Sequence, residues 1–184
     1  MNLTIPNLLS IARMGLIPLF VIAVLEQQPQ RALAVFVIAG VTDALDGLIA
    51  RYLDQQSVLG AYLDPIADKL LLTTAFVILA IPNTHTGILI PIWITVLVLA
   101  RDVTILVVSL VLQLVMSITE FPPMTLSKVN TAVQITAIIL VLITGLTESI
   151  DTLVLGTLYL VAGLTVLSGL LYIHHVNKML AARD

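Results

Sequence analysis

The sequence predicts an all-α integral membrane protein with six transmembrane helices and a short interfacial helix at its N-terminal end. Of its 184 residues, 59% are hydrophobic and only 10% are charged, with a mean hydropathy of +1.12. Soluble domains carry about 25% charged residues, so little of this chain is built to face water. Its apolar residues fall into six runs of about 20 residues, the length that a helix needs to cross a bilayer core of roughly 30 Å. The polar segments between the runs are too short for a second domain, and we expect one domain over residues 1–184.

Residues that begin or end helices mark the borders of the predicted spans. Pro6 suits the first turn of a helix and Asn7 can cap it, so we expect an interfacial helix that runs into a first span at 8–25. We see no convincing internal repeat, which argues against a transporter built from inverted repeats. The remaining spans are expected at 32–53, 59–81, 88–116, 126–146 and 152–173, with a polar tail at 174–184.

The basic residues predict the orientation of these spans. Six spans place both termini and the loops at 54–57 and 117–125 on one side of the membrane, and Arg31 is the one basic residue expected on the other side. The positive-inside rule therefore makes the first side cytoplasmic. The basic residues nearer that side are Arg13, Arg51, Lys69, Lys128, Lys178 and Arg183.

The N-terminal segment and the composition narrow the class of protein further. The first apolar run is broken by Arg13 and Pro18 and follows no basic segment, so we expect no cleavable signal peptide. We favour a bacterial inner-membrane protein, or a mature form already trimmed. The chain has no cysteine, which excludes disulfides, thiol catalysis and cysteine metal sites. We expect neither an organic cofactor nor a nucleic-acid partner, and we expect His85, His174 and His175 to be solvated at span ends.

The most informative stretch, residues 42–68, carries acids at fixed spacing. Asp43 and Asp46 are three residues apart, and Asp64 and Asp68 are four apart. If both segments are helical, each pair lies on one helix face, and a short turn between the helices would bring four carboxylates together. At membrane depth such carboxylates repel one another and lose hydration, so they need protons or cations. One or two divalent ions would resolve the conflict, and all-oxygen ligation suits Mg²⁺, Mn²⁺ or Ca²⁺.

Three other residues of the stretch suit a ligand that carries phosphate. Gly47 and Gly60 have no side chain, so a ligand or a neighbouring helix can approach the backbone closely. Arg51, one turn after Gly47, can direct a guanidinium group at a phosphate. The alternative is a set of helix-surface acids in loops, which would not explain the glycines at their fixed places.

This pattern resembles the signature of the CDP-alcohol phosphatidyltransferase family, integral membrane enzymes that move a phosphatidyl group from CDP-diacylglycerol to an alcohol. The resemblance implies two Mg²⁺ or Mn²⁺ ions at the donor diphosphate, a general base at Asp68 and a homodimer. The metal ligands would be Asp43, Asp46, Asp64 and Asp68, and the residues contacting CDP-diacylglycerol would be Asn7, Gly47, Arg51 and Ser57. The matched signature positions are Asp43, Asp46, Gly47, Ala50, Arg51, Gly60, Asp64 and Asp68.

Polar residues in the later spans point to the acceptor alcohol. Arg101 and Asp102 sit inside the fourth expected span, where charges are costly and usually functional or paired. Adjacent residues on a helix point about 100° apart, so we do not expect these two to face one another. They either pair with other helices or, as we favour, Arg101 binds the acceptor phosphate. Lys128, Thr131 and Gln134 fall at three-residue steps, and we expect a polar stripe that faces inward.

Each of these polar residues also has a purely structural interpretation. Asn7 could be a helix cap and Arg13 a snorkelling arginine at the end of the first span. Lys128 could snorkel too, with its polar neighbours serving helix packing. We prefer an acceptor pocket lined by Arg101, Lys128 and Asn130.

The R-D-V and S-K-V-N-T-A-V-Q segments of the fourth and fifth spans resemble one branch of the family. In that branch phosphatidylglycerol is the acceptor, and the products are cardiolipin and CMP. Scarcity of cations outside the signature also favours this lipid over glycerol 3-phosphate, the acceptor of the runner-up branch, because a nearly dianionic phosphate needs several cationic donors. A third alternative, a divalent-cation channel or transporter, predicts polar breaks across both membrane halves, whereas the acids here cluster towards one side.

Overall fold

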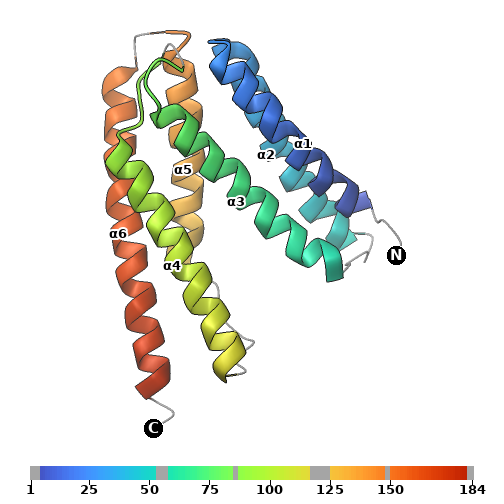
Figure 1. Ribbon diagram of the computed structural model, residues 1–184, viewed down its shortest axis with the longest axis vertical. Coiled ribbons are helices and arrows are strands. Elements are labelled where there is room, and N and C mark those ends of the chain that lie inside the picture. Colours follow the sequence, from blue (N-terminus) through green and yellow to red (C-terminus); the bar gives the residue numbers. More distant parts are fainter. Residues whose placement is uncertain (1–4, 53–57, 85–86, 117–124, 148–149, 182–184) are drawn as a thin grey trace. The chain divides into compact units, whose positions relative to one another are not determined.

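The computed structural model describes residues 5–52, 58–84, 87–116, 125–147 and 150–181 as six α-helices with short connections and no strand (Figure 1). Side chains are described for 11–42, 69–84, 87–109, 126–147 and 150–178. The helices are α1 (Ile5–Leu25), α2 (Pro29–Tyr52), α3 (Val58–Ala80), α4 (Ile92–Met116), α5 (Thr125–Thr144) and α6 (Asp151–Ala181).

Most helices lie where the spans were expected, and α1 joins two expected elements. It runs from Ile5 to Leu25 without a break and contains Pro18, so the interfacial helix and the first span form one continuous helix. The N-terminal bounds fit the prediction that Pro6 lies in the first turn, where its missing N–H is not needed for a helical hydrogen bond.

The start of α4 and the end of α6 differ from the expected spans. Residues 88–91 are not helical, because Pro91 opens the helix instead: its carbonyl accepts hydrogen bonds from the backbone N–H groups of Ile94, at 2.9 Å, and Thr95, at 3.3 Å. At the other end, α6 continues to Ala181, so most of the expected polar tail is part of the helix. The polar residues after 173 include no proline or glycine, so nothing in that segment stops a helix.

Among the described residues, three helices are long and apolar enough to cross a membrane. They contain the segments Ile92–Ser109, Leu126–Thr144 and Asp151–Lys178. Shorter apolar segments occupy α1, α2 and α3 at Ile11–Leu25, Pro29–Thr42 and Lys69–Ala80. The described part of the chain therefore has the helical structure and composition of an integral membrane protein.

The chain divides into two compact units. The first contains Met1–Leu89 and Ile138–Asp151, and the second contains Ile90–Ala137 and Thr152–Asp184. In the first unit α1 packs against both α2 and α3, with the rings of the buried residues Phe20 and Phe36 5.7 Å apart. In the second unit α5 runs antiparallel to α4 and α6 (Figure 1).

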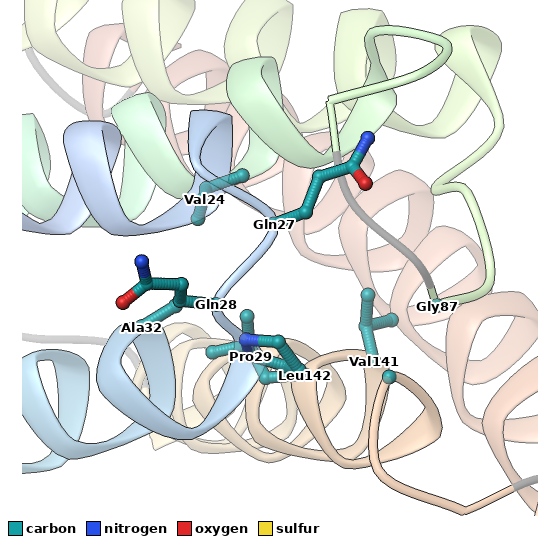
Figure 2. Close-up of a pocket in the computed structure, with 9 residues that line it drawn as sticks. Val24, Gln27, Gln28, Pro29, Ala32, Gly87, Val141 and Leu142 are labelled. Atoms are coloured by element: carbon teal, nitrogen blue, oxygen red, sulfur yellow. The ribbon is translucent and has the colours of Figure 1, made fainter.

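A tight turn in the first unit joins α1 to α2. The N–H of Gln28 donates to the carbonyl of Ala23, the N–H of Gln27 donates to that of Val24, and Gln27 has a φ of 55°. This is the Schellman pattern, in which a left-handed residue ends the helix. Beside the turn lies a cavity of about 10 Å³, too small for more than one water molecule (Figure 2). Its lining is almost wholly apolar, so we assign it no ligand.

Candidate active site

The aspartates of the signature lie on two helices of the first unit. Asp43 and Asp46 are on the C-terminal half of α2, and Asp64 and Asp68 are within the first three turns of α3. Both segments are helical, as expected, so each pair shares one face of its helix. The side chains of all four residues lie outside the part that the structure describes, and their convergence stays a prediction.

The two aspartate-bearing helices share a neighbour. Both α2 and α3 pack against α1, and α2 ends at Tyr52 only a few residues before α3 begins at Val58. A short connection between consecutive helices keeps the end of one close to the start of the next. The donor set is four carboxylates, which are the oxygen ligands that Mg²⁺ and Mn²⁺ prefer. On these grounds the residues present fit a divalent-metal site.

The predicted donor contacts are placed in part. Gly47 and Arg51 lie on α2 with the first aspartate pair, and Asn7 lies near the start of α1, with side chains outside the described part. Ser57 also lies outside the described residues. Arg13 is fully buried on α1, with 0% of its surface exposed, so the snorkelling alternative for this residue is wrong. A snorkelling arginine would extend its head group to the membrane surface, whereas the side chain of Arg13 is enclosed by the protein.

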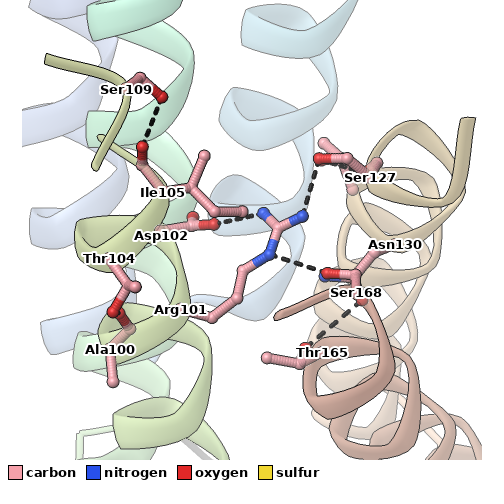
Figure 3. A network of polar contacts seen from close by, with 11 residues as sticks. Ala100, Arg101, Asp102, Thr104, Ile105, Ser109, Ser127, Asn130, Thr165 and Ser168 are labelled. Atoms are coloured by element: carbon pink, nitrogen blue, oxygen red, sulfur yellow. Dashed lines mark hydrogen bonds and ion pairs between the residues drawn. The ribbon is translucent and has the colours of Figure 1, made fainter. Parts of the chain in front are cut away.

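Arg101 is the centre of a polar network in the second unit (Figure 3). Its Nε donates to Ser168 Oγ of α6 at 2.9 Å, and its Nη2 donates to Ser127 Oγ of α5 at 2.7 Å. Its Nη1 donates to Asp102 Oδ1 at 2.7 Å, and the two side chains are 5% and 11% exposed. The expectation that these neighbours would not face one another was therefore wrong. The arginine side chain is long enough to curve around the helix and reach the next residue.

The network leaves Arg101 with spare hydrogen-bonding capacity. A guanidinium group carries five N–H donors, and three of them are used by the serines and the aspartate. Within the part of the chain that the structure describes, the remaining donors have no recorded partner. A Cβ added at Gly169 would lie 3.7 Å from Arg101 Cγ, an ordinary van der Waals contact, so the arginine does not require a glycine at that position.

Ser168 was missed by the sequence analysis, although a signal for it exists. Thr165 and Ser168 are three residues apart in an otherwise apolar stretch of α6, so both lie on one face of that helix. Both side chains are buried, at 0% and 2% exposure. Small hydroxyl residues inside a transmembrane helix commonly serve interhelical hydrogen bonds.

The polar stripe on α5 differs from the predicted one. Lys128 is exposed and Thr131 is half-buried, whereas Asn130 and Gln134 are 0% and 1% exposed. The inward polar face therefore runs from half-buried Ser127 through the buried residues Asn130 and Gln134 and leaves out the lysine. Steps of three and four residues follow the helical repeat of 3.6 more closely than repeated steps of three. Of the three predicted acceptor residues, Arg101 and Asn130 are buried in the second unit, and Lys128 lies on the surface of α5.

The histidines contribute nothing to either region in the described part of the chain. His174 is exposed and His175 is half-buried on α6, whereas His85 lies outside the described residues. No group of three metal-binding side chains occurs among those described, a set that does not include the four aspartates.

Comparison with known proteins identifies the family. Residues 3–172 match the profile of the CDP-alcohol phosphatidyltransferase family, which covers nearly the whole chain and both compact units. The chain belongs to this family.

Individual relatives refine the comparison. A cardiolipin synthase (CMP-forming) from Rattus norvegicus is 34% identical over 95% of this chain and 62% of its own length. One from Streptomyces coelicolor is 43% identical over 60% of this chain and 52% of its own. A CDP-diacylglycerol–glycerol-3-phosphate 3-phosphatidyltransferase from Haemophilus influenzae is 40% identical over 57% of both chains. This chain thus spans less than two thirds of the length of the relatives that it matches.

Proposed function

We propose that this protein is a cardiolipin synthase of the CMP-forming type, which transfers the phosphatidyl group of CDP-diacylglycerol to phosphatidylglycerol. The observation that carries the proposal is the match to the rat enzyme over 95% of the chain. A match of that extent includes the aspartate segment of α2 and α3 as well as the Arg101 network.

The glycerol 3-phosphate branch remains the alternative because of the H. influenzae relative. Its match covers 57% of this chain, too short to run from Asp43 to Ser168. That match therefore cannot include the whole set of residues that we assign to donor and acceptor. The described cations also favour the lipid acceptor, because Arg101 is the one buried basic side chain described in the second unit.

The donor site is proposed on α2 and α3. Asp43, Asp46, Asp64 and Asp68 would hold two Mg²⁺ or Mn²⁺ ions, and the chemistry that bound ions supply is neutralisation of the diphosphate charge and stabilisation of the departing CMP. Gly47 lets the nucleotide approach the backbone of α2. The guanidinium group of Arg51 and the hydroxyl of Ser57 would contact the diphosphate or the cytidine, and Asn7 would contact the nucleotide from α1. The list of donor-site residues is Asn7, Asp43, Asp46, Gly47, Arg51, Ser57, Asp64 and Asp68.

The reaction needs one proton transfer, which we assign to Asp68. Its carboxylate would accept the proton of the acceptor hydroxyl as that oxygen attacks the phosphorus of the phosphatidyl group. The new phosphorus–oxygen bond forms as the bond to CMP breaks, and CMP leaves as a phosphate monoester. Attack and departure in line require that donor and acceptor be held in fixed positions.

The acceptor site is proposed on the second unit. The spare N–H donors of Arg101 would bind the phosphate of phosphatidylglycerol, a phosphodiester with one negative charge. Exposed Lys128 would add a second cation, and Asn130 a neutral contact. One or two cations suit this monoanion.

The remaining features of the proposal concern the membrane. We propose six spans in a single domain over residues 1–184, a homodimer, and a bacterial inner membrane with the site facing the cytoplasm. The family match through both units supports one domain. The distribution of basic residues, with Arg31 expected alone on the far side, supports the orientation.

One assay tests the proposed reaction. The purified protein in lipid vesicles receives CDP-diacylglycerol with either phosphatidylglycerol or glycerol 3-phosphate, and the product lipids are identified by mass spectrometry. We expect cardiolipin and CMP from the first pair. Phosphatidylglycerophosphate from the second pair, with no cardiolipin from the first, would replace the proposal with the alternative.

A further inference from the structure

Two carboxamide side chains in the second unit are buried without a full set of partners. Asn130 and Gln134 are one turn apart on α5, with 0% and 1% exposure. Asn130 Oδ1 accepts a hydrogen bond from the hydroxyl of Thr165 on α6 at 3.4 Å (Figure 3). Among the residues that the structure describes, none pairs with Asn130 Nδ2 or with either polar atom of Gln134.

Unpaired polar atoms of this kind need an explanation. A buried carboxamide loses its hydrogen bonds to water, and inside a membrane protein it gains nothing from lipid in exchange. An apolar side chain of similar volume would pack at the same place without that cost. Nearly all buried polar groups are paired, so a cluster of three unpaired atoms indicates that a bound molecule completes it.

The chemistry of the three atoms specifies the missing group. The two amide nitrogens offer N–H donors, and Gln134 Oε1 is an acceptor. A hydroxyl group both accepts and donates, so one hydroxyl could accept from Asn130 or Gln134 and donate to Gln134 Oε1. A phosphate would present oxygens alone and would leave Gln134 Oε1 unpaired.

The position of the pair relates it to the network of Arg101. Ser127, which accepts from Arg101 Nη2, lies on α5 one turn before Asn130 and two turns before Gln134. Side chains on a helix lean towards its N-terminus, so Gln134 leans towards Asn130 and the arginine end of the face. The buried face therefore presents a cation at one end and a hydroxyl-binding pair beyond it.

We propose that Asn130 and Gln134 bind the hydroxyl of the acceptor head group that does not react. This inference rests on the proposed function, in which the acceptor is a glycerol phosphodiester. Its head group carries a terminal hydroxyl, which attacks the donor, and a middle hydroxyl, which is kept in the product. With the phosphate at Arg101 and the middle hydroxyl at the carboxamides, the three-carbon head group is fixed at two points. With the head group held at these two points, only rotation about the bond to the terminal hydroxyl remains free.

A deoxy acceptor tests the contact directly. Phosphatidyl-1,3-propanediol keeps the phosphate and the terminal hydroxyl but has hydrogen in place of the middle hydroxyl. The full-length protein in vesicles is assayed for kcat/KM with this lipid and with phosphatidylglycerol, using the wild type and Gln134→Leu. We expect the wild type to prefer phosphatidylglycerol by about ten- to hundredfold, because the analogue without the hydroxyl leaves the buried carboxamides unpaired. In Gln134→Leu the preference should fall to within about threefold, because leucine offers the hydroxyl no hydrogen bond.

Stability separates this role from a structural one. Without acceptor, the Tm of Gln134→Leu should equal or exceed that of the wild type, because the carboxamide that it removes pairs with none of the described side chains or backbone groups. A resident structural water would give the opposite pattern, with a lower Tm and an unchanged preference between the two lipids, and that pattern would overturn the inference. Gln134→Met, which is unbranched like glutamine, serves if the leucine variant does not fold.

A control variant and a second substrate pair complete the test. Thr136→Val alters an exposed hydroxyl on α5 that donates to the carbonyl of Ala132 at 2.9 Å, and it should keep the wild-type preference. If the wild type makes no cardiolipin, the proposed function fails, and the same comparison is made with glycerol 3-phosphate and 1,3-propanediol phosphate. With whichever acceptor the enzyme uses, Gln134→Leu should lose the preference for the hydroxyl-bearing acceptor over its deoxy analogue. If that preference persists, Gln134 does not bind the hydroxyl.

Discussion

Two regions of the protein differ in how their charges are compensated. They are the aspartate segment of α2 and α3 and the Arg101 network of α4, α5 and α6. The first places Asp43, Asp46, Asp64 and Asp68 within 26 residues of sequence, with Arg51 as the one cation at a fixed signature position. In the second, the charge of Arg101 is distributed over three partners on three helices. A cluster of carboxylates needs bound cations to neutralise its charge. The charge of Arg101 is already paired within the protein, and only its spare N–H donors remain for a ligand. We infer that the first region is built for metal and diphosphate, and the second for a weakly charged alcohol.

Removal of divalent metal should have the largest effect and should act on the first region. We expect cardiolipin formation to stop in excess chelator and to return when Mg²⁺ or Mn²⁺ is added, because four crowded carboxylates cannot hold a diphosphate without cations. The measurement is product formation during titration with chelator and then with metal. Full turnover in excess chelator would refute the metal role.

Asp68→Asn should separate the general base from donor binding. The substitution removes the carboxylate that takes the proton but keeps a side chain of the same shape, and the other three aspartates stay in place. We expect kcat to fall by about 10²–10⁴-fold, the usual contribution of a general base, while the Kd for CDP-diacylglycerol changes much less. Wild-type turnover in this variant would mean that the base is elsewhere in the chain.

Arg101→Ala should destabilise the fold as well as impair the acceptor site. It removes three hydrogen bonds and leaves Asp102, whose side chain is 11% exposed, without its arginine. Breaking a buried ion pair costs about 3–5 kcal/mol, which thermal or chemical unfolding in detergent would detect. Thr104→Val on the same helix is a matched control, because its exposed hydroxyl donates to the carbonyl of Ala100 at 2.7 Å. Equal stability of the two variants would show that the network does not hold the helices.

A substitution outside both regions should have the smallest effect and change stability alone. Gln27 ends α1 in the left-handed conformation, with a φ of 55°, and glycine adopts that conformation without strain. We expect Gln27→Gly to raise the free energy of unfolding by about 0.5–1 kcal/mol with unchanged kcat/KM. Gln27→Ala is the control, because it also loses the side-chain hydrogen bond to the carbonyl of Asn83 but keeps the strain. A gain in the alanine variant as well would refute the conformational explanation.

The two regions also differ in how far the sequence predicts them. The aspartate signature is local, since three- and four-residue spacings on helices determine which residues share a face. The Arg101 network joins residues 26 and 67 positions apart, and no spacing rule connects Arg101 to Ser127 or Ser168. The same limit explains the misplaced stripe on α5. Lys128, Asn130 and Gln134 are all polar, and only the packing of neighbouring helices decides which of them is buried.

Helix borders show the same division between local and tertiary information. Pro6 correctly predicts the start of α1, whereas the start of α4, which follows Pro91, was predicted a few residues early. Residues 88–91 look apolar enough to be helical, yet the N–H of Ile88 donates to Thr144 Oγ1 at 2.9 Å, a partner supplied by α5. The end of α6 was predicted early for the converse reason, because polar residues can extend a transmembrane helix beyond its apolar core.

Lys128→Ala tests most directly whether donor and acceptor are recognised by different regions. The side chain is exposed on α5, so its removal should leave the fold intact. The measurement pairs kcat/KM for phosphatidylglycerol with the Kd for CDP-diacylglycerol in the same preparation. Loss of one charge-assisted phosphate contact should cost about 1.5–3 kcal/mol, or roughly ten- to a hundredfold in acceptor efficiency, with donor affinity unchanged. Equal weakening of donor binding and acceptor use, or no loss of acceptor efficiency, would contradict the division between the two regions.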